Sequence, residues 1–270
     1  MAGSTSGRVL AYDRAGCGEP LLLVHGLGSA RTTWLPLMPD LRRRFEVLAV
    51  DLPGHGGSPA LPRTEPATPR RLAATVAALL DQLGFDRVHV MGNSLGGWVG
   101  LELAASGRAR SSVGLAPAGL WLSPGTRRNP LLQFNRLLAS STRSLHPLVL
   151  RSATVRALAM SSGSAWPREV SYDTALAAAR AQSDSPGYIS ALDGTLGNRF
   201  DRGGQIPADV PVTVIFGDRD RILPGPVLQE RSLLPAHARW VQLSHCGHAP
   251  QWDAPGAVVR ELERATLGAR

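Results

Sequence analysis

Ser94 lies in a stretch that could make its hydroxyl a nucleophile. The apolar, β-branched run at residues 88–91 ends in Gly92-Asn93-Ser94-Leu95-Gly96, and an alanine-rich apolar stretch follows. This G-x-S-x-G pattern is typical of a sharp turn from strand to helix, with the serine strained and glycine where side chains would collide. The turn would place the hydroxyl at the first turn of the helix, whose free N–H groups favour developing negative charge. The alternative is a structural glycine-rich turn with a capping serine.

A nucleophilic serine needs a base, and the base needs an acid that holds it. Two later apolar runs lead to such residues. The run at 211–216 precedes Asp218 and Asp220, and the run at 239–243 precedes His245 and His248. Because alternating strands and helices predict a parallel sheet, reactive residues should lie on the loops after the strand ends. One Asp and one His from these pairs would follow Ser94 in the chain order Ser, Asp, His that serine hydrolysis on such a sheet requires.

The loop after the buried run Leu21–Val24 could bind an anion. It begins His25-Gly26-Leu27-Gly28. The backbone N–H of Leu27, together with that of Leu95, could form an oxyanion hole. The two leucines would then act through their backbones and not through their side chains. His55, in the next glycine-rich turn, is expected to be structural because a stronger histidine candidate comes later in the chain.

The glycines of this loop permit a second interpretation. Gly26 and Gly28 after a buried strand, with Asp51 closing the next apolar run, imitate a dinucleotide-binding fingerprint. Arg31 stands at the sixth position of that fingerprint, where glycine is required, and Trp34-Leu-Pro36 interrupts the helix that should bind the phosphates. We therefore expect no dinucleotide cofactor.

Length and composition limit the fold class and the location. With 270 residues, of which 43% are hydrophobic, the chain can form one large α/β domain. No run of about 18 apolar residues predicts a membrane span, and residues 1–8 lack the apolar core of a signal peptide. We therefore predict a cytoplasmic protein. Its two cysteines, Cys17 and Cys246, are expected to be free thiols, and a cysteine-rich metal site is ruled out.

The formal charge of +8 raises the question of a nucleic-acid partner. The chain has no lysine, and its arginines are scattered or in short groups such as Arg42-Arg43-Arg44 and Arg70-Arg71, without interleaved aromatic residues. Such groups are typical of a solvated surface. We therefore expect no nucleic-acid partner.

Apolar periodicity predicts alternating strands and helices along most of the chain. Strands are expected at 8–13, 21–24, 45–50, 88–91, 111–116, 211–216 and 239–243. Helices are expected at 70–83, 98–105 and 255–267. From 118 to 207 the strand-like runs disappear, and helical segments are expected at 131–139, 148–160 and 174–182. The sequence therefore predicts an α/β core with an inserted helical region.

Taken in order, these motifs resemble the α/β-hydrolase superfamily from about residue 8 to the end of the chain. The matching segments are His25-Gly-Leu-Gly28, Asp51-Leu-Pro-Gly-His-Gly-Gly-Ser58, Gly92-Asn-Ser-Leu-Gly-Gly97, 217–224 and Gly247-His-Ala-Pro250. The resemblance implies a mostly parallel, eight-stranded sheet with helices on both faces. Residues 1–117 and 208–270 would form this core, and 118–207 a helical cap. Since little chain precedes Arg8, we expect the first strand to be missing or vestigial.

The resemblance also implies roles for single residues. Ser94 would be the nucleophile, His248 its general base, and Asp220 the acid that holds the imidazole. The family pattern places the acid three residues after Gly217, so Asp218 is expected to bond the backbone of its own turn. His245 is expected to be structural. The resemblance implies neither a metal ion nor a cofactor.

A serine at the turn narrows the range of reactions. Members of the superfamily that open epoxides or displace halide use Asp there, and this chain has Ser94. We predict a carboxylesterase-like enzyme that cleaves an ester, or a related acyl bond, of a small-to-medium apolar substrate. The alternatives are a hydrolase that cleaves carbon–carbon bonds in ring-cleavage-type diketones, and a non-catalytic small-molecule binding protein on the same fold. The residues expected to line the pocket are His25, Gly26, Trp121, Phe134 and Trp166, and Tyr188 is a further candidate.

Overall fold

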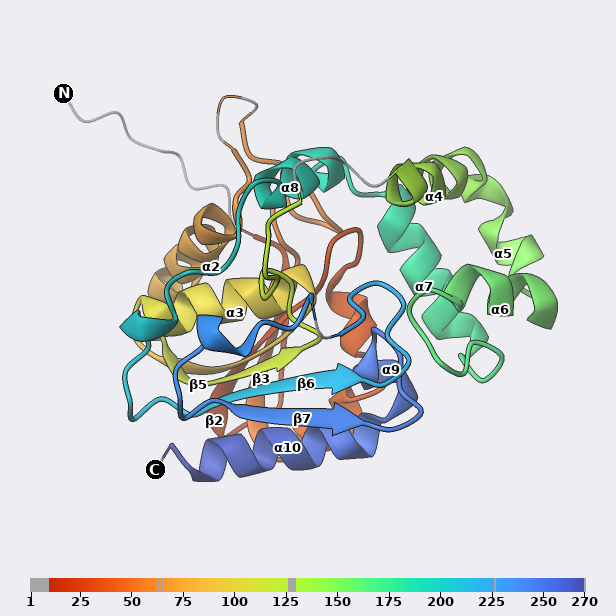
Figure 1. The fold of residues 1–270 in the computed structure, drawn as a ribbon. Coiled ribbons are helices and arrows are strands. Elements are labelled where there is room, and N and C mark those ends of the chain that lie inside the picture. The colour runs from red at the N-terminus through yellow and green to blue at the C-terminus, as the bar shows by residue number, and fades with distance from the viewer. Residues whose placement is uncertain (1–9, 63, 65, 126–129, 226, 270) are drawn as a thin grey trace.

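The computed structural model describes residues 10–62, 64, 66–125, 130–225 and 227–269, with the backbone alone at 130–135 (Figure 1). Its strands form one sheet in the order β1-β3-β2-β4-β5-β6-β7. β1 is antiparallel to β3, and every other neighbouring pair is parallel. The strands are β1 Tyr12–Ala15, β2 Glu19–Val24, β3 Phe45–Val50, β4 Val88–Asn93, β5 Ala109–Leu115, β6 Val212–Gly217 and β7 Arg239–Leu243.

Helices cover both faces of the sheet because the strands alternate their apolar side chains between two cores. In β2, Leu22 and Val24 pack in a core that includes α2 (Pro69–Gln82) and α3 (Leu95–Ala105). Leu21 and Leu23 pack in a second core that includes α1 (Met38–Leu41) and α10 (Pro255–Leu267). Figure 1 shows α10 below the sheet and α2 and α3 above it. A strand buried on both faces explains the uninterrupted apolar run in the sequence.

The predicted fold class, a mostly parallel sheet with helices on both faces, is confirmed. The described residues contain seven strands, so the strand expected to be missing or vestigial is not among them. The edge strand predicted at 8–13 lies at Tyr12–Ala15, and residues 8 and 9 are outside the described part of the chain. The helix predicted to begin at Trp98 begins at Leu95, because Ser94 is its N-cap.

Helices also fill the stretch between β5 and β6. They are α4 Pro130–Ser141, α5 His146–Val149, α6 Ala153–Met160, α7 Tyr172–Ser183 and α8 Tyr188–Thr195, which we call the α4–α8 insert. The helix predicted at 148–160 is broken in two, because the Ser152 side chain accepts a hydrogen bond from the Val155 N–H and caps α6. α8 was not predicted. None of the described helices is long and apolar enough to cross a bilayer.

α8 fixes the insert to the core by close backbone contacts. The Gly187 N–H donates to the Gly54 carbonyl at 2.8 Å. A Cβ atom on Gly54 would lie 2.5 Å from the Gly187 Cα, and a Cβ atom on Gly194 would lie 2.2 Å from the Ala67 carbonyl oxygen. Only glycine permits these approaches. The insert is therefore joined to the loops that follow β3.

The parallel strands bring four loops to one edge of the sheet. The loops after β2, β4, β6 and β7 begin at the carboxyl ends of strands that are neighbours or near neighbours in the sheet. These are the loops that carry the residues singled out in the sequence, and binding and reactive groups of open α/β sheets gather at this edge.

The Gly194 contact predicts that alanine at this position destabilises the fold, whereas alanine at a control glycine does not. Gly194→Ala should lower the free energy of unfolding by about 2–4 kcal/mol, because its methyl group meets backbone that cannot move freely. Gly256→Ala in α10 is the control, since the nearest atom to its new Cβ is an arginine side-chain nitrogen at 3.5 Å. Alanine there should stabilise the helix by up to about 1 kcal/mol. Urea denaturation of both variants measures the difference, and equal effects would refute the packing of α8 on the core.

Candidate active site

Ser94 occupies a strained turn between β4 and α3. Its backbone has φ 54° and ψ −117°, a conformation that a residue with a side chain rarely adopts. A Cβ atom on Gly92 would lie 2.1 Å from the Gly96 carbonyl oxygen, and one on Gly96 would lie 2.1 Å from the Val24 carbonyl oxygen. The two glycines of the G-x-S-x-G pattern are therefore required by close packing of backbone on backbone. The serine N–H donates to the Leu115 carbonyl at 2.8 Å, which fixes the turn to β5.

The structure brings His248 and Asp220 together. The His248 Nδ1 lies 2.8 Å from the Asp220 Oδ2, and both side chains are buried. The other carboxylate oxygen accepts the N–H groups of Ile222 and Leu223 at 2.8 and 2.9 Å. Because an ionised carboxylate only accepts, the imidazole proton is on Nδ1. The Nε2 atom is then the nitrogen that can take a proton.

The surroundings of Asp220 keep its carboxyl group ionised. Burial alone would raise its pKa, but the hydrogen bond and charge of His248 and the two backbone N–H groups act in the opposite direction. Their combined effect holds the pKa of Asp220 below its ordinary value. The partner of His248 is therefore a carboxylate at neutral pH.

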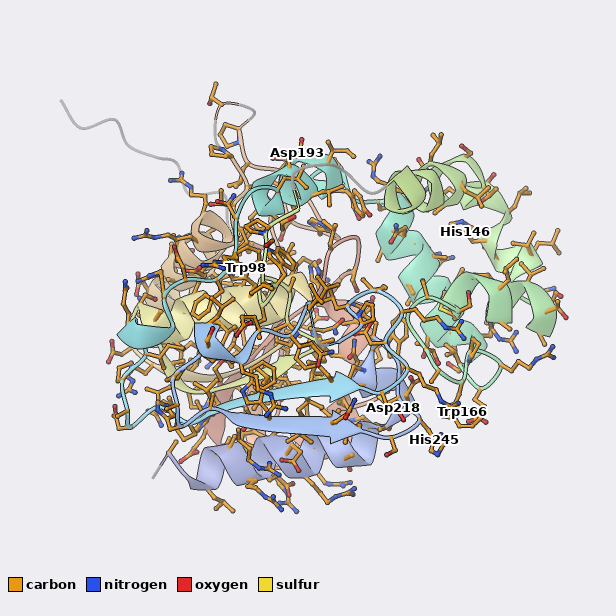
Figure 2. All side chains as sticks on the ribbon, in the orientation of Figure 1. Trp98, His146, Trp166, Asp193, Asp218 and His245 are labelled. Carbon is orange, nitrogen blue, oxygen red and sulfur yellow. The ribbon has the colours of Figure 1, made fainter. Side chains whose placement is uncertain are left out.

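The rival acid and the rival base make other contacts. The Asp218 carboxylate accepts the Cys246 N–H at 3.2 Å, and backbone hydrogen bonds from His245 and Cys246 hold its pKa below the ordinary value. The His245 Nδ1 accepts a hydrogen bond from the Arg219 guanidinium at 2.6 Å. Figure 2 shows Asp218 and His245 beyond the ends of β6 and β7, near Trp166. Through these bonds, Asp218 and His245 join the turn after β6 to the loop after β7.

Asn93 joins the serine turn to the loop that carries His248. Its side-chain N–H groups donate to the carbonyls of Leu115 and His248, each at 3.0 Å. Its side-chain oxygen accepts a hydrogen bond from Gln251 at 3.3 Å. The residue next to Ser94 thus holds the backbone of His248. Sequence reasoning missed this role, because no local pattern links residues 93 and 248.

Asp253 joins the same loop to the insert, and it was also missed. One carboxylate oxygen accepts the N–H groups of Gly247 and Ala165, at 2.7 and 2.8 Å, and the other accepts the Ser164 hydroxyl. On the far side of His248, the Ala249 N–H donates to the carbonyl of residue 163 at 2.8 Å. The backbone on both sides of His248 is therefore held against the segment 163–165.

His25 orients the loop after β2. Its Nδ1 lies 2.7 Å from the Gly26 carbonyl oxygen and its Nε2 lies 2.9 Å from the Leu52 nitrogen. Since a carbonyl only accepts, Nδ1 carries the proton and Nε2 accepts the Leu52 N–H. A peptide C=O and the following N–H point in opposite directions, so the Leu27 N–H points away from the buried ring. Gly26 lies against Ser94, since a Cβ atom there would be 3.2 Å from the serine Cβ.

His25 and His55 form a buried pair of neutral rings. Their ring centroids are 5.3 Å apart, and neither side chain has exposed surface. The pKa of His25 is lowered to about 4, chiefly by burial and to a smaller extent by the charge of Arg31, while the hydrogen bond to the Gly26 carbonyl acts in the opposite direction. Burial lowers the pKa of His55 to about 3, and His25 adds to this effect. His55 donates to the Pro53 carbonyl at 3.0 Å, which is the structural role expected for it.

The residues expected to line a pocket have diverse surroundings. The Trp121 ring packs edge-on against Trp98 with centroids 5.4 Å apart, and its N–H donates to the Asn198 carbonyl. Trp166 lies on the surface of the insert and donates to the His245 carbonyl at 2.8 Å. The His25 ring has both nitrogens occupied by backbone groups. The side chain of Phe134 lies outside the described residues.

The two cysteines are not part of the candidate site described above. Cys17 is exposed and Cys246 is buried, and both are free thiols. Burial raises the pKa of Cys246 to about 12, so its thiol stays protonated and unreactive. In the described ranges, no cluster of three or more His, Cys, Asp or Glu side chains could hold a metal ion.

Comparison with known proteins identifies the family. The family model described as "Alpha/beta hydrolase family" matches residues 21–261. The chain belongs to the alpha/beta hydrolase family. The similarity to hydrolases in sequence and structure makes it an enzyme of this class.

Two relatives and one solved structure show how far the similarity extends. The pimeloyl-[acyl-carrier protein] methyl ester esterase of Aeromonas hydrophila is 29% identical over 266 residues, which cover 94% of this chain and 98% of the relative. Epoxide hydrolase EphH of Mycobacterium tuberculosis is 34% identical over 198 residues, covering 70% of this chain and 90% of the relative. The enol-lactonase structure from Burkholderia xenovorans has the same fold, with a TM-score of 0.75, 23% identity and 96% of each chain covered.

The buried histidines predict an acid-sensitive fold. Below pH 6.5 an unfolded histidine takes up a proton, whereas the folded His55 does so only near pH 3. The free energy of unfolding should therefore fall as the pH falls from 6.5 towards 3, on the order of 3 kcal/mol from this residue alone. His55→Gln removes the titrating ring, so its curve should be flatter than that of the unaltered protein. Urea titrations across this pH range measure both slopes, and parallel curves would refute the assignment.

Proposed function

We propose that this enzyme is a cofactor-independent serine hydrolase that cleaves an ester of a small-to-medium apolar acyl group. Ser94 is the nucleophile, His248 the general base and later the general acid, and Asp220 the carboxylate that orients and stabilises the imidazole. The backbone N–H groups of Leu27 and Leu95 form the oxyanion hole. The α4–α8 insert acts as the cap that contributes to the acyl pocket.

In the first half of the reaction the acyl group moves to the enzyme. The Ser94 Oγ attacks the ester carbonyl carbon while the His248 Nε2 takes the hydroxyl proton. The carbonyl oxygen becomes an oxyanion that the N–H groups of Leu27 and Leu95 stabilise. When this intermediate collapses, the C–O bond to the alcohol breaks and His248 gives its proton to the leaving oxygen. The products of this half are the free alcohol and an acyl ester on Ser94.

In the second half, water takes the place of the alcohol. The neutral His248 removes a proton from a water molecule, whose oxygen attacks the acyl carbon. The oxyanion forms again in the same place, and its collapse breaks the bond to Ser94, which regains the proton held by His248. Asp220 stays ionised throughout and stabilises the imidazolium that forms in each half. Carboxylic acid leaves and the enzyme returns to its starting state.

One observation carries this proposal. The buried 2.8 Å contact between His248 and Asp220 belongs to a loop whose backbone bonds to Asn93, the neighbour of the strained Ser94. An imidazole held in this way has one nitrogen left for proton transfer. The strained backbone of Ser94 costs energy, and strain of this kind is typical of functional sites.

Two further arguments favour an ester as the substrate. The Aeromonas relative, which matches nearly the whole chain, is named a methyl ester esterase. The Mycobacterium relative is named an epoxide hydrolase, but a serine at position 94 suits acyl transfer, since superfamily members that open epoxides use Asp there.

A fluorophosphonate tests the nucleophile directly. The unaltered protein should gain the mass of one phosphonyl group, and Ser94→Ala and His248→Ala should gain none. Intact-mass spectrometry measures the adduct. A protein that takes up no adduct would contradict the serine mechanism, and an adduct that persists in Ser94→Ala would place the nucleophile elsewhere. A panel of esters and diketones then separates ester hydrolysis from carbon–carbon cleavage by kcat/KM.

If Asp220 and not Asp218 is the acid, substitutions at these two positions should change kcat/KM by very different amounts. Asp220→Asn should lower kcat/KM for an ester by about 10²–10⁴-fold, because the amide no longer stabilises the imidazolium. Asp218→Asn is the matched control, and it should change kcat/KM by less than about threefold, since its carboxylate contacts only backbone and neighbouring charges. Steady-state kinetics decide the matter, and the reverse order of effects would assign the acid to Asp218.

Asp253 is proposed as a positioning residue for His248. Asp253→Asn weakens the bond to the Gly247 N–H and should lower kcat by about tenfold to a hundredfold with little change in KM, because the imidazole is displaced. Ser164→Ala removes the hydroxyl that donates to Asp253 and accepts the Trp166 N–H, but it leaves the bonds from the Gly247 and Ala165 N–H groups to Asp253, so it should cost less. The pH profile of kcat should also move in Asp253→Asn. A variant that loses thermal stability but keeps kcat and its pH profile would show a purely structural role.

A further inference from the structure

The outer end of the insert takes no part in the site, yet it carries many exposed apolar side chains. α4, α5 and α6 pack against α7 and, in Figure 1, form the end of the insert farthest from the sheet. Six of the eleven large apolar side chains that are exposed in the described structure belong to this end, and each keeps between 41% and 76% of its surface in solvent. They are Leu137, Leu138, Leu145, Leu148, Val155 and Leu158. Such a concentration marks a surface for interaction.

The same end of the insert contains a polar hollow, whose wall includes chain neighbours of Leu145 and Leu148. Its volume is about 600 Å³, and its walls are Ser140, Ser141, Arg143, Ser144, Pro147, Arg180 and Asp184. Asp184 pairs with Arg143 at 3.1 Å, and both side chains are partly exposed. Arg180 has no ion pair with a carboxylate in the described part of the chain. The hollow thus presents guanidinium and hydroxyl donors against a single carboxylate.

The charge of this face is mainly positive. Residues 137–158 contain three arginines, Arg143, Arg151 and Arg156, and no Asp or Glu. Asp184, which pairs with Arg143, is the carboxylate in the wall of the hollow. Arg143 and Arg151 lie on exposed positions among the apolar side chains. A surface that is both cationic and apolar fits a partner that is both anionic and apolar.

We propose that this face, formed by residues 137–158 together with Arg180, docks on a membrane surface that contains anionic phospholipid. The donors of the hollow suit a lipid phosphate, and guanidinium groups close to an anionic bilayer gain favourable energy. The leucines beside the hollow enter the boundary between headgroups and acyl chains. These apolar side chains project from three short helices and a turn. A lipid surface can deform to fit such separate side chains, whereas an acidic protein would need a surface shaped to match them.

Docking of this kind would bring the insert to a surface where apolar acyl compounds concentrate. It involves neither Ser94 nor His248, so its test does not depend on the proposed reaction. It is a peripheral attachment, because the apolar side chains lie on the outside of short helices.

Co-sedimentation with vesicles tests the proposal. The full chain should bind vesicles of phosphatidylcholine with about 30 mol% phosphatidylglycerol, and bind pure phosphatidylcholine at least about tenfold more weakly. Raising the salt from about 0.05 M to about 0.5 M should release most of the bound protein. The triple variant Leu145→Ser/Leu148→Ser/Leu158→Ser and the double variant Arg143→Gln/Arg180→Gln should each weaken binding by at least about tenfold.

Control variants of the same chemistry separate this face from the rest of the surface. Leu267→Ser changes an exposed leucine of α10, and Arg110→Gln/Arg260→Gln removes two exposed charges of the core. Both should bind as the unaltered protein does, and circular dichroism should show all variants folded. Failure of the unaltered protein to bind the anionic vesicles would overturn the proposal, as would equal losses in the control variants. Binding to an acidic protein without binding to vesicles would also overturn it.

Discussion

The left-handed backbone of Ser94 is the constraint on which the rest of the site depends. A conformation of this kind costs on the order of 1–3 kcal/mol, so the surrounding structure must hold it. The flanking backbone does so, because Gly92 and Gly96 let α3 and β2 approach closer than any side chain would allow, and β5 accepts the serine N–H. The turn places Ser94 at the N-cap of α3, directly after β4. In the proposed mechanism the other groups act on this fixed point.

Hydrogen bonds from a few polar side chains fix the loops that carry the other groups of the proposed site. His25 fixes the loop after β2, Asn93 and Asp253 fix the loop after β7, and Asp220 fixes the ring of His248. Each of these groups is fully or largely buried, and each has partners for its hydrogen-bonding atoms, so its geometry is stiff. In the proposed acyl transfer, such an arrangement supplies precise placement of the groups more than any single strong interaction.

The sequence was sufficient to predict elements whose signals are local. The strand at 239–243 and the helix at 255–267 lie where periodicity placed them, and glycine spacing identified the turn at Ser94. Contacts between distant residues left no such signal. Asn93 bonds a carbonyl 155 residues away, and Asp253 bonds the insert 88 residues away, so both looked like ordinary polar positions. α8 escaped prediction because its Gly194 is unfavourable in an isolated helix and is explained only by the core backbone against which it packs.

The central claim is that Ser94, His248 and the N–H groups of Leu27 and Leu95 meet at one reacting carbon. A crystal structure of the protein after treatment with a fluorophosphonate tests it most directly, because the phosphonyl group imitates the tetrahedral intermediate. The account predicts phosphorus on the Ser94 Oγ and a phosphoryl oxygen within about 2.7–3.1 Å of both backbone nitrogens. A phosphoryl oxygen directed to solvent, or an adduct on another residue, would contradict it.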